Sequence, residues 1–314
     1  MHPHIEIDST RLAAHLVAER VWGWEVPVYL FLGGLVAGLM IAVSAAILTL
    51  GKERATKAMR LGLLAAPVLL SLGMGSLFLD LTYKLHVFRF YTTVVPSAPM
   101  SLGSWVLMLV YPVQLALILA LPHSMLDPYL ARVPQLAAVR AWAERNVGAL
   151  ALAGLGLGVA LGIYTGVLLS ATVARPLWSS GALGFLFLAS GSSTGVALLM
   201  IAERDHAMNA LFAKADIVLI TLELLLIGSW IVGLATQGPL YREAATLLIK
   251  GPYAPAFVGV VVFGGLLVPA ALETLSLRGK ALHSRWTPAL VLAGGLILRF
   301  VIVYAGQDVG FVTG

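Results

Sequence analysis

Eight long apolar stretches divide this 314-residue chain, and they constrain its fold more than any other feature. Hydrophobic residues make up 60% of the chain and charged residues 11%, whereas an ordinary soluble domain has about 45–50% and about 25%. Crossing the bilayer core takes about 20 apolar residues per helix. The sequence therefore predicts an all-α integral membrane protein and excludes a soluble enzyme, a disordered chain and a disulfide scaffold. The predicted transmembrane helices are 26–50, 61–83, 103–122, 147–170, 176–202, 214–235, 254–276 and 286–306.

The loops between these stretches differ in their content of Lys and Arg, which predicts the orientation of the chain. Loops 51–60 and 123–146, and those before the sixth and eighth helices, carry more basic residues than the loops on the opposite side. Basic loops face the cytoplasm, so both termini are predicted to lie outside. The expected location is a bacterial or archaeal cytoplasmic (inner) membrane, with both termini on its periplasmic side. The orientation of the chain therefore explains the excess of basic residues. The lipid bilayer is the expected partner, and no nucleic-acid partner is expected.

Segments outside the helices are short. Residues 1–25 form a predicted periplasmic segment, in which 9–22 could form an interfacial helix. Met1–Arg11 has no apolar core of a signal peptide, so no cleavage is expected. A second surface helix is predicted within 239–252, between two Gly-Pro pairs.

Small residues recur at helical spacing in two predicted spans. Glycines occur every fourth residue from Gly154 to Gly166 in the fourth helix, and Gly34 and Gly38 do so in the first. Such spacing favours close helix packing, so these glycines are predicted to be structural.

Polar side chains gather at the outer third of the first four predicted helices. An ionisable residue at membrane depth is costly and indicates function. Some members have simpler explanations, since Lys84 and His86 could anchor the chain at the interface and Ser101 could cap a helix. The candidate site residues are Glu25, Tyr29, Asp80, Tyr83, Lys84, His86, Ser101, Ser104 and Tyr164.

A second buried polar set lies in the other half of the chain. The predicted depths of Glu223 and Arg299 match, which favours an intramembrane ion pair. One explanation is a structural salt bridge with water-facing carboxylates, and the other is a proton path from the cytoplasm toward mid-membrane. The candidate residues of this path are Glu203, Asp216, Glu223, Glu273 and Arg299.

The residue types that hold redox cofactors are scarce. All seven His residues fall in termini, loops or helix ends, which disfavours bis-histidine haem. Without Cys there are no thiolate ligands for an iron–sulfur cluster. No haem, iron–sulfur cluster or metal is therefore expected within this chain, and electrons would need a partner protein.

Four motifs resemble those of the NrfD/PsrC family, the membrane subunits of polysulfide and formate-dependent nitrite reductases. They occur in the expected order from the first helix to the eighth, so the resemblance covers essentially the whole chain. The motifs are Trp24–Gly38, Ser97–Trp105, Tyr164–Ser170 and Leu298–Gln307.

This resemblance implies two four-helix bundles, 26–170 and 171–314, with a quinone site near the outer face of the first. Menaquinone or ubiquinone would be the substrate. An extrinsic iron–sulfur protein would dock on the periplasmic face, next to a catalytic subunit of molybdopterin or multihaem type. Glu25 and Tyr29 fall where family members place quinone-contacting side chains, and Tyr164 matches a tyrosine near the quinone.

The resulting hypothesis is a quinol or quinone oxidoreductase subunit that is not a complete enzyme on its own. Asp80 or Glu25 would act as the catalytic base, and Tyr29 or Tyr164 would hydrogen-bond a quinone oxygen. The alternatives are a secondary transporter with an intramembrane Glu/Arg site, or a passive membrane anchor.

Overall fold

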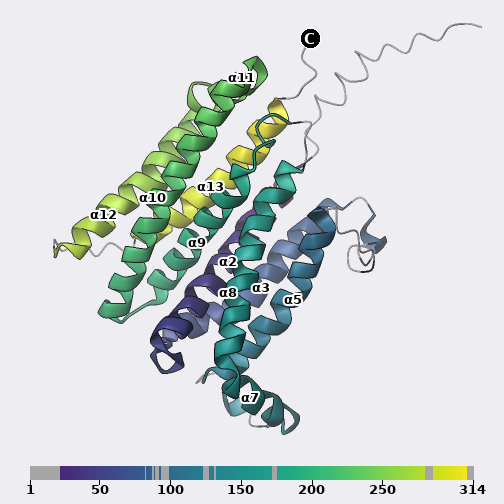
Figure 1. Ribbon diagram of the computed structural model, residues 1–314, viewed down its shortest axis with the longest axis vertical. Helices are drawn as coiled ribbons and strands as arrows, with labels where there is room; N and C mark the ends of the chain where they lie inside the picture. The colour runs from purple at the N-terminus through teal and green to yellow at the C-terminus, as the bar shows by residue number, and fades with distance from the viewer. Residues whose placement is uncertain are drawn as a thin grey trace, which may run out of the picture.

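The computed structural model describes residues 22–309, except 82, 87, 89–91, 93–98, 123–126, 131, 172–174 and 280–285. All regular structure within these ranges is helical, and eight helices are long and apolar enough to cross a membrane (Figure 1). The prediction of an all-α, multi-pass membrane protein with eight spans is confirmed.

The eight spans match the apolar stretches one to one. Between them lie the short helices η1 (Lys52–Arg54), η2 (Lys84–His86), α6 (Asp127–Leu130), α7 (Gln135–Arg145) and α11 (Pro239–Ile249). The spans are α2 (Glu25–Leu50), α3 (Lys57–Asp80), α5 (Pro99–Ala120), α8 (Val147–Ser170), α9 (Ala182–Ala202), α10 (His206–Gln237), η3 (Pro255–Leu267) continued by α12 (Val268–Leu277), and α13 (Trp286–Asp308).

Most helix boundaries differ from the prediction by a few residues, and three of these differences have a visible local cause. Helix α3 ends at Asp80 rather than 83, because Leu81 adopts an extended backbone. Helix α9 begins at Ala182 rather than 176, because the preceding residues form turns. Helix α10 begins eight residues early, at His206, where the Asp205 side chain caps the amide of Ala207.

The two predicted surface helices have different outcomes. Helix α11 confirms the one within 239–252. It follows Gly238, whose φ of +151° favours glycine, and it begins at Pro239. The helix predicted at 9–22 lies outside the described residues, apart from Trp22.

The first span, α2, is the innermost helix. In its most apolar window 72% of the residues are buried, compared with 67% for α9 and 28% for α10. It packs against α3 and α8 on one side and against α9 and α13 on the other. Helix α2 therefore joins the two halves of the chain.

Glycines allow these close approaches, as predicted. A Cβ on Gly38 would collide with the backbone of Gly191 and Ser192, and a Cβ on Gly195 would collide with that of Gly38. In α8, Gly158 faces Ala37 and Gly166 faces Leu183. The α2–α9 and α8–α9 contacts are thus made backbone to backbone.

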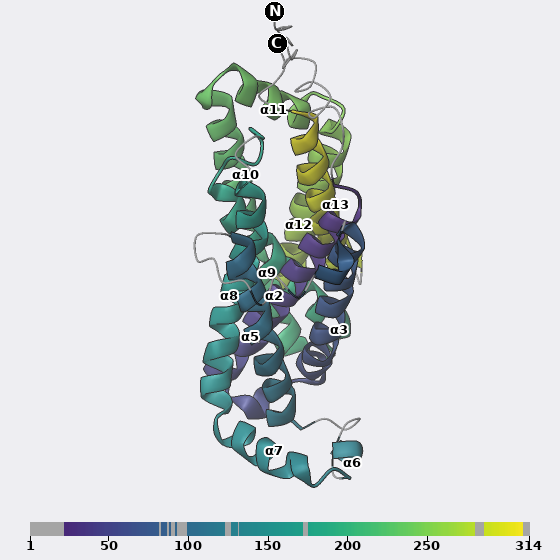
Figure 2. The ribbon, with the colours of Figure 1, turned by 90° about the vertical axis from the view of Figure 1, so that its right-hand side faces the viewer.

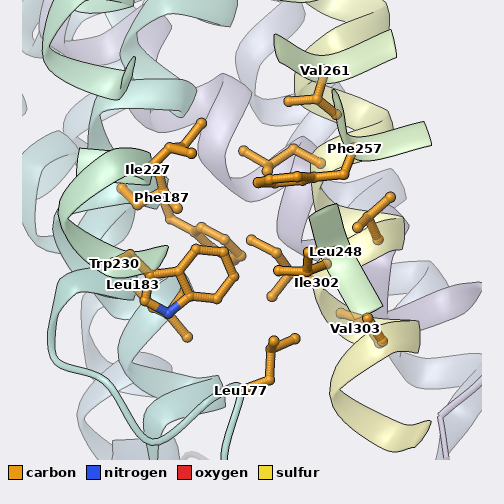
Figure 3. Packing of buried hydrophobic residues seen from close by; sticks show 14 of the residues in the cluster. Leu177, Leu183, Phe187, Ile227, Trp230, Leu248, Phe257, Val261, Ile302 and Val303 are labelled. Atoms are coloured by element: carbon orange, nitrogen blue, oxygen red, sulfur yellow. The ribbon is translucent and has the colours of Figure 1, made fainter. Parts of the chain in front are cut away.

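Large apolar side chains fill the rest of the interior. One cluster joins α9, α10, α11, η3 and α13, where Phe187 and Trp230 lie across from Phe257 and Ile302 (Figure 3). A second cluster joins α2, α3, α5 and α8, together with Met208 and Phe212 of α10.

The molecule has two ends, marked by α11 and α7 (Figures 1 and 2). Helix α13 ends beside α11, and Trp22, just before α2, contacts the end of α13. We call this the α11 end, and the opposite one the α7 end.

Candidate functional site

The beginning of α2 and the end of α3 bring three predicted site residues together at the α11 end. The Ser76 hydroxyl donates to the backbone carbonyl of Glu25 (3.2 Å), which fixes the two helices side by side. Asp80, one turn beyond Ser76, is half-buried and interacts electrostatically with Glu25. Tyr29 lies one turn deeper than Glu25 and is fully buried beside Gly73.

Helices α5 and α8 bring Tyr164 to the same end. A Cβ on Gly103 would overlap the tip of the Tyr164 ring, so this ring lies directly on the α5 backbone. Ser101 and Ser104 flank Gly103, are both buried, and are joined by a hydrogen bond from Ser104 Oγ to the Ser101 carbonyl (2.8 Å). The next residue after Tyr164 ties α8 to α2, because the Thr165 methyl group lies against Gly33. Tyr29 and Tyr164 therefore lie on two helices, α2 and α8, that are in contact with each other.

Three predicted site residues lie outside this interior. Tyr83 is 75% exposed, and Lys84 and His86 are exposed in η2. The Tyr83 and His86 rings make an edge contact with centroids 6.2 Å apart. All three residues lie on the surface at the α11 end. Their contact with a quinone stays a prediction.

A polar network links the start of the described chain to its last helix. The Gln307 side chain accepts from the Trp22 amide (2.8 Å) and donates to the Trp22 carbonyl (3.1 Å). Trp22 stacks on Trp178, whose indole donates to the Ile302 carbonyl. Arg175 donates to the Gln307 carbonyl (2.5 Å); burial lowers the pKa of Arg175, and the Asp308 carboxylate partly offsets this effect.

The second half of the chain holds a buried charge beside α2. Arg299 donates to the Ser190 hydroxyl and to the carbonyls of Gly295 (3.1 Å) and Phe187 (3.3 Å). Its guanidinium also lies 4.7 Å from the centre of the Phe187 ring and faces Gly34 of α2. Glu223 attracts Arg299 through space and lies beside Ser190. The two opposite charges attract each other, as the predicted ion pair implies, and both groups contact Ser190.

A second buried acidic group lies two helical turns from Glu223 on α10. Asp216 accepts a hydrogen bond from Ser193 of α9 (2.5 Å), and its carboxyl group is next to that of Glu273 on α12. Asp216 and Glu273 are both buried. Among the described residues no donor reaches Asp216 Oδ2 or either oxygen of Glu273.

The fifth member of the predicted proton path, Glu203, is engaged elsewhere. It accepts from the Thr56 hydroxyl (2.6 Å) and from the amides of Arg204 and Asp205. These bonds tie the start of α3 to the α9–α10 turn at the α7 end.

Sequence reasoning missed Ser190, Ser193 and Gly103 as site residues. The two serines are three residues apart on α9, so they share one face, opposite the carboxylates of α10. That spacing inside a span was the available signal. Within the ranges that the structure describes, no group of three or more His, Asp or Glu residues is arranged to hold a metal.

Comparison with known proteins gives the family. The model of the family described as "Polysulphide reductase, NrfD" matches residues 14–310. The chain belongs to the NrfD family. Family membership thus spans both the α2–α3–α5–α8 site and the buried polar groups of the second half.

Individual relatives of this NrfD-family protein cover nearly its whole length. The C chain of polysulfide reductase from Wolinella succinogenes is 32% identical over 91% of the present sequence and 94% of its own length. Protein NrfD of Escherichia coli is 31% identical over 95% of the present sequence and 98% of its own. The NrfD homologue of Haemophilus influenzae is 27% identical over 91% and 94%.

Proposed function

We propose that this protein is the membrane subunit of a respiratory reductase complex and that it oxidises a quinol, or reduces a quinone, at the α11 end. It would exchange electrons with an extrinsic iron–sulfur subunit on the periplasmic face. That subunit would in turn exchange electrons with a further catalytic subunit. Family membership and the name of the Wolinella relative, which is part of polysulfide reductase, support a role within a reductase complex.

One observation carries the assignment of the site. Four helices bring two tyrosines, the buried Tyr29 and the half-buried Tyr164, and two carboxyl groups, those of Glu25 and Asp80, to the same end. A quinol needs a hydrogen-bond partner at its oxygen and an acceptor for the protons that it loses with its electrons. These two pairs supply both kinds of group.

The proposed mechanism assigns one role to each pair. A tyrosine hydroxyl orients the quinol oxygen. As two electrons leave, Asp80 or Glu25 accepts one of the two hydroxyl protons, and the other leaves to the aqueous face. The electrons pass to a partner, because a chain without cysteine offers no thiolates for an iron–sulfur cluster. The half-buried position of Asp80 at the end of α3 gives the accepted proton a route to the aqueous face.

Replacement of Asp80 by Asn tests this role. We expect quinol turnover to fall by about 10²–10⁴-fold, the usual contribution of a general base, because the amide keeps the shape but accepts no proton. Turnover of a quinol analogue is measured on the purified complex, with subunit content as the check on assembly. Asp308→Asn is the matched control, since Asp308 lies at the same end and its hydrogen bond from Tyr253 survives the change. Wild-type turnover in Asp80→Asn would contradict the role of Asp80.

Gentle purification separates the proposal from its two rivals. We expect an iron–sulfur protein and bound quinone to co-purify with the protein. A lone subunit that transports a solute would establish the transporter with a Glu223–Arg299 site, and partners without quinone would establish the passive anchor.

For the second half we propose a proton path that runs from the α7 end toward mid-membrane. We infer two four-helix bundles, α2–α3–α5–α8 and α9–α10–η3/α12–α13, which meet where α2 and α8 pack against α9. The path is supported by the buried side chains of Asp216, Glu223, Glu273 and Arg299 within the second group. Ionisable groups are retained at such depth chiefly for transport of charge or protons.

A further inference from the structure

The buried polar groups of the second half form two clusters, and each cluster includes one serine of α9. Asp216 and Glu223 share a face of α10 but lie two turns, about 10 Å, apart. Helix α9 fills the interval with Ser193, bound to Asp216, and Ser190, beside Glu223 and Arg299. Each serine thus serves one of the two carboxylates.

We propose that Ser193 and Ser190 relay protons between two buried acidic stations, the Asp216–Glu273 pair and Glu223. This inference rests on the proposed function, in which the second half conducts protons, and it assigns the step that connects the carboxylates. The two serine positions are one helical turn apart, a rise of about 4.5 Å, and one bridging water can span such a gap between hydroxyl groups.

The Asp216–Glu273 pair is the loading station at the α7 end. Two adjacent buried carboxyl groups cannot both carry a charge without a counter-cation, so the pair holds a single shared proton. A shared proton also accounts for the oxygens of Asp216 and Glu273 that lack a donor among the described residues. Glu273 lies four residues before the end of α12, which brings this station close to the aqueous side.

Proton balance in the relay requires only the two serines, the carboxyl groups and the one bridging water, which gains one proton and loses one. The Ser193 hydroxyl, which donates to Asp216, first turns toward the bridging water. The pair then releases its proton to the Ser193 oxygen, while Ser193 passes its own proton to the water and the water passes one to Ser190. Ser190 passes its own proton to Glu223, so each hydroxyl gains one proton and loses one. Arg299 donates to Ser190 and attracts Glu223, and its fixed charge holds the receiving end in place beside α2.

The test measures protons moved per electron in proteoliposomes that contain the complete complex. We expect Ser193→Ala and Ser190→Ala each to lose transmembrane proton movement, while quinol turnover with an uncoupler persists. Ser193→Thr restores the hydroxyl and should restore proton movement. Ser192→Ala is the matched control, because Ser192 lies between the two serines on the α9 face toward Gly38.

Loading is tested separately by infrared spectroscopy of the same complex. A shared proton predicts one buried carboxyl C=O band that disappears in both Asp216→Asn and Glu273→Gln. Two independent bands, one lost in each variant, would overturn the shared proton. A wild-type ratio of protons to electrons in both serine-to-alanine variants would overturn the relay. Dependence of wild-type charge movement on sodium would overturn the proton as the ion carried. Absence of quinol turnover from the wild-type complex would instead refute the quinone function itself.

Discussion

The Gly103→Ala variant is expected to lose quinol turnover by roughly 100-fold while it folds and assembles normally. A Cβ at this position would occupy the space of the Tyr164 ring tip. The tip of a side chain gives way more easily than a helix backbone does, so the added methyl group displaces the tyrosine hydroxyl rather than the fold. A displacement of about 1 Å at a reacting group can cost 10²-fold in rate.

Two comparisons make this result specific. Gly75→Ala on α3 adds a Cβ that meets nothing within 4 Å, so its turnover should stay at the wild-type level. If Gly103→Ala acts by moving Tyr164, the double variant with Tyr164→Phe should be no slower than the slower single variant, because coupled residues are not additive. Additive losses would show that Gly103 acts by another route, and full turnover in Gly103→Ala would remove Tyr164 from the quinone site.

The Gly38→Leu variant should fail to accumulate as folded protein. Even a Cβ at Gly38 collides with the backbone of Gly191 and Ser192, and a leucine would force α2 away from α9. Overpacking a core by ordinary side-chain growth costs about 1–3 kcal/mol. Here the obstacle is main chain rather than a movable side chain, so we expect a larger cost.

Gly156→Leu is the matched control, since it also replaces a glycine in the middle of a span. A Cβ at Gly156 meets nothing within 4 Å, and this position on α8 is exposed, so the leucine should meet lipid and be tolerated. Abundance in the membrane and elution as a single species after solubilisation measure both variants. Normal amounts of monodisperse Gly38→Leu would contradict the close α2–α9 contact.

Hydropathy could predict the number of spans but not every helix end. A transmembrane window detects the length of sequence that matches the bilayer core, whereas α10 begins before that window and includes polar residues such as His206 and Asn209. The opposite error affected α9, because the apolar residues Leu177 and Trp178 are buried in turns that pack on α13. Hydropathy therefore predicted that Leu177 and Trp178 are buried, but it predicted the wrong secondary structure for them. It also missed the first two turns of α10.

The candidate site shows a similar division. Charged and aromatic residues stand out in apolar helices, so Asp80, Tyr164, Asp216 and Arg299 could be selected from the sequence alone. Ser190 and Ser193 were missed despite their helical spacing, because serine is common in packed membrane helices and only the opposing carboxylates distinguish these two. Matched depth along two helices could place Glu223 near Arg299, but it could not show that both groups contact Ser190.

The central position of α2 also has a consequence for how the protein is made. A ribosome makes α2 before the other described spans, and α9 and α13 follow only after α3, α5 and α8 have been made. Until then the glycine face of α2 lacks its final partners, and the Trp22 backbone lacks the Gln307 side chain, which lies near the end of the sequence. Closure of the α11 end, and of any site built there, therefore waits until α13 has been made.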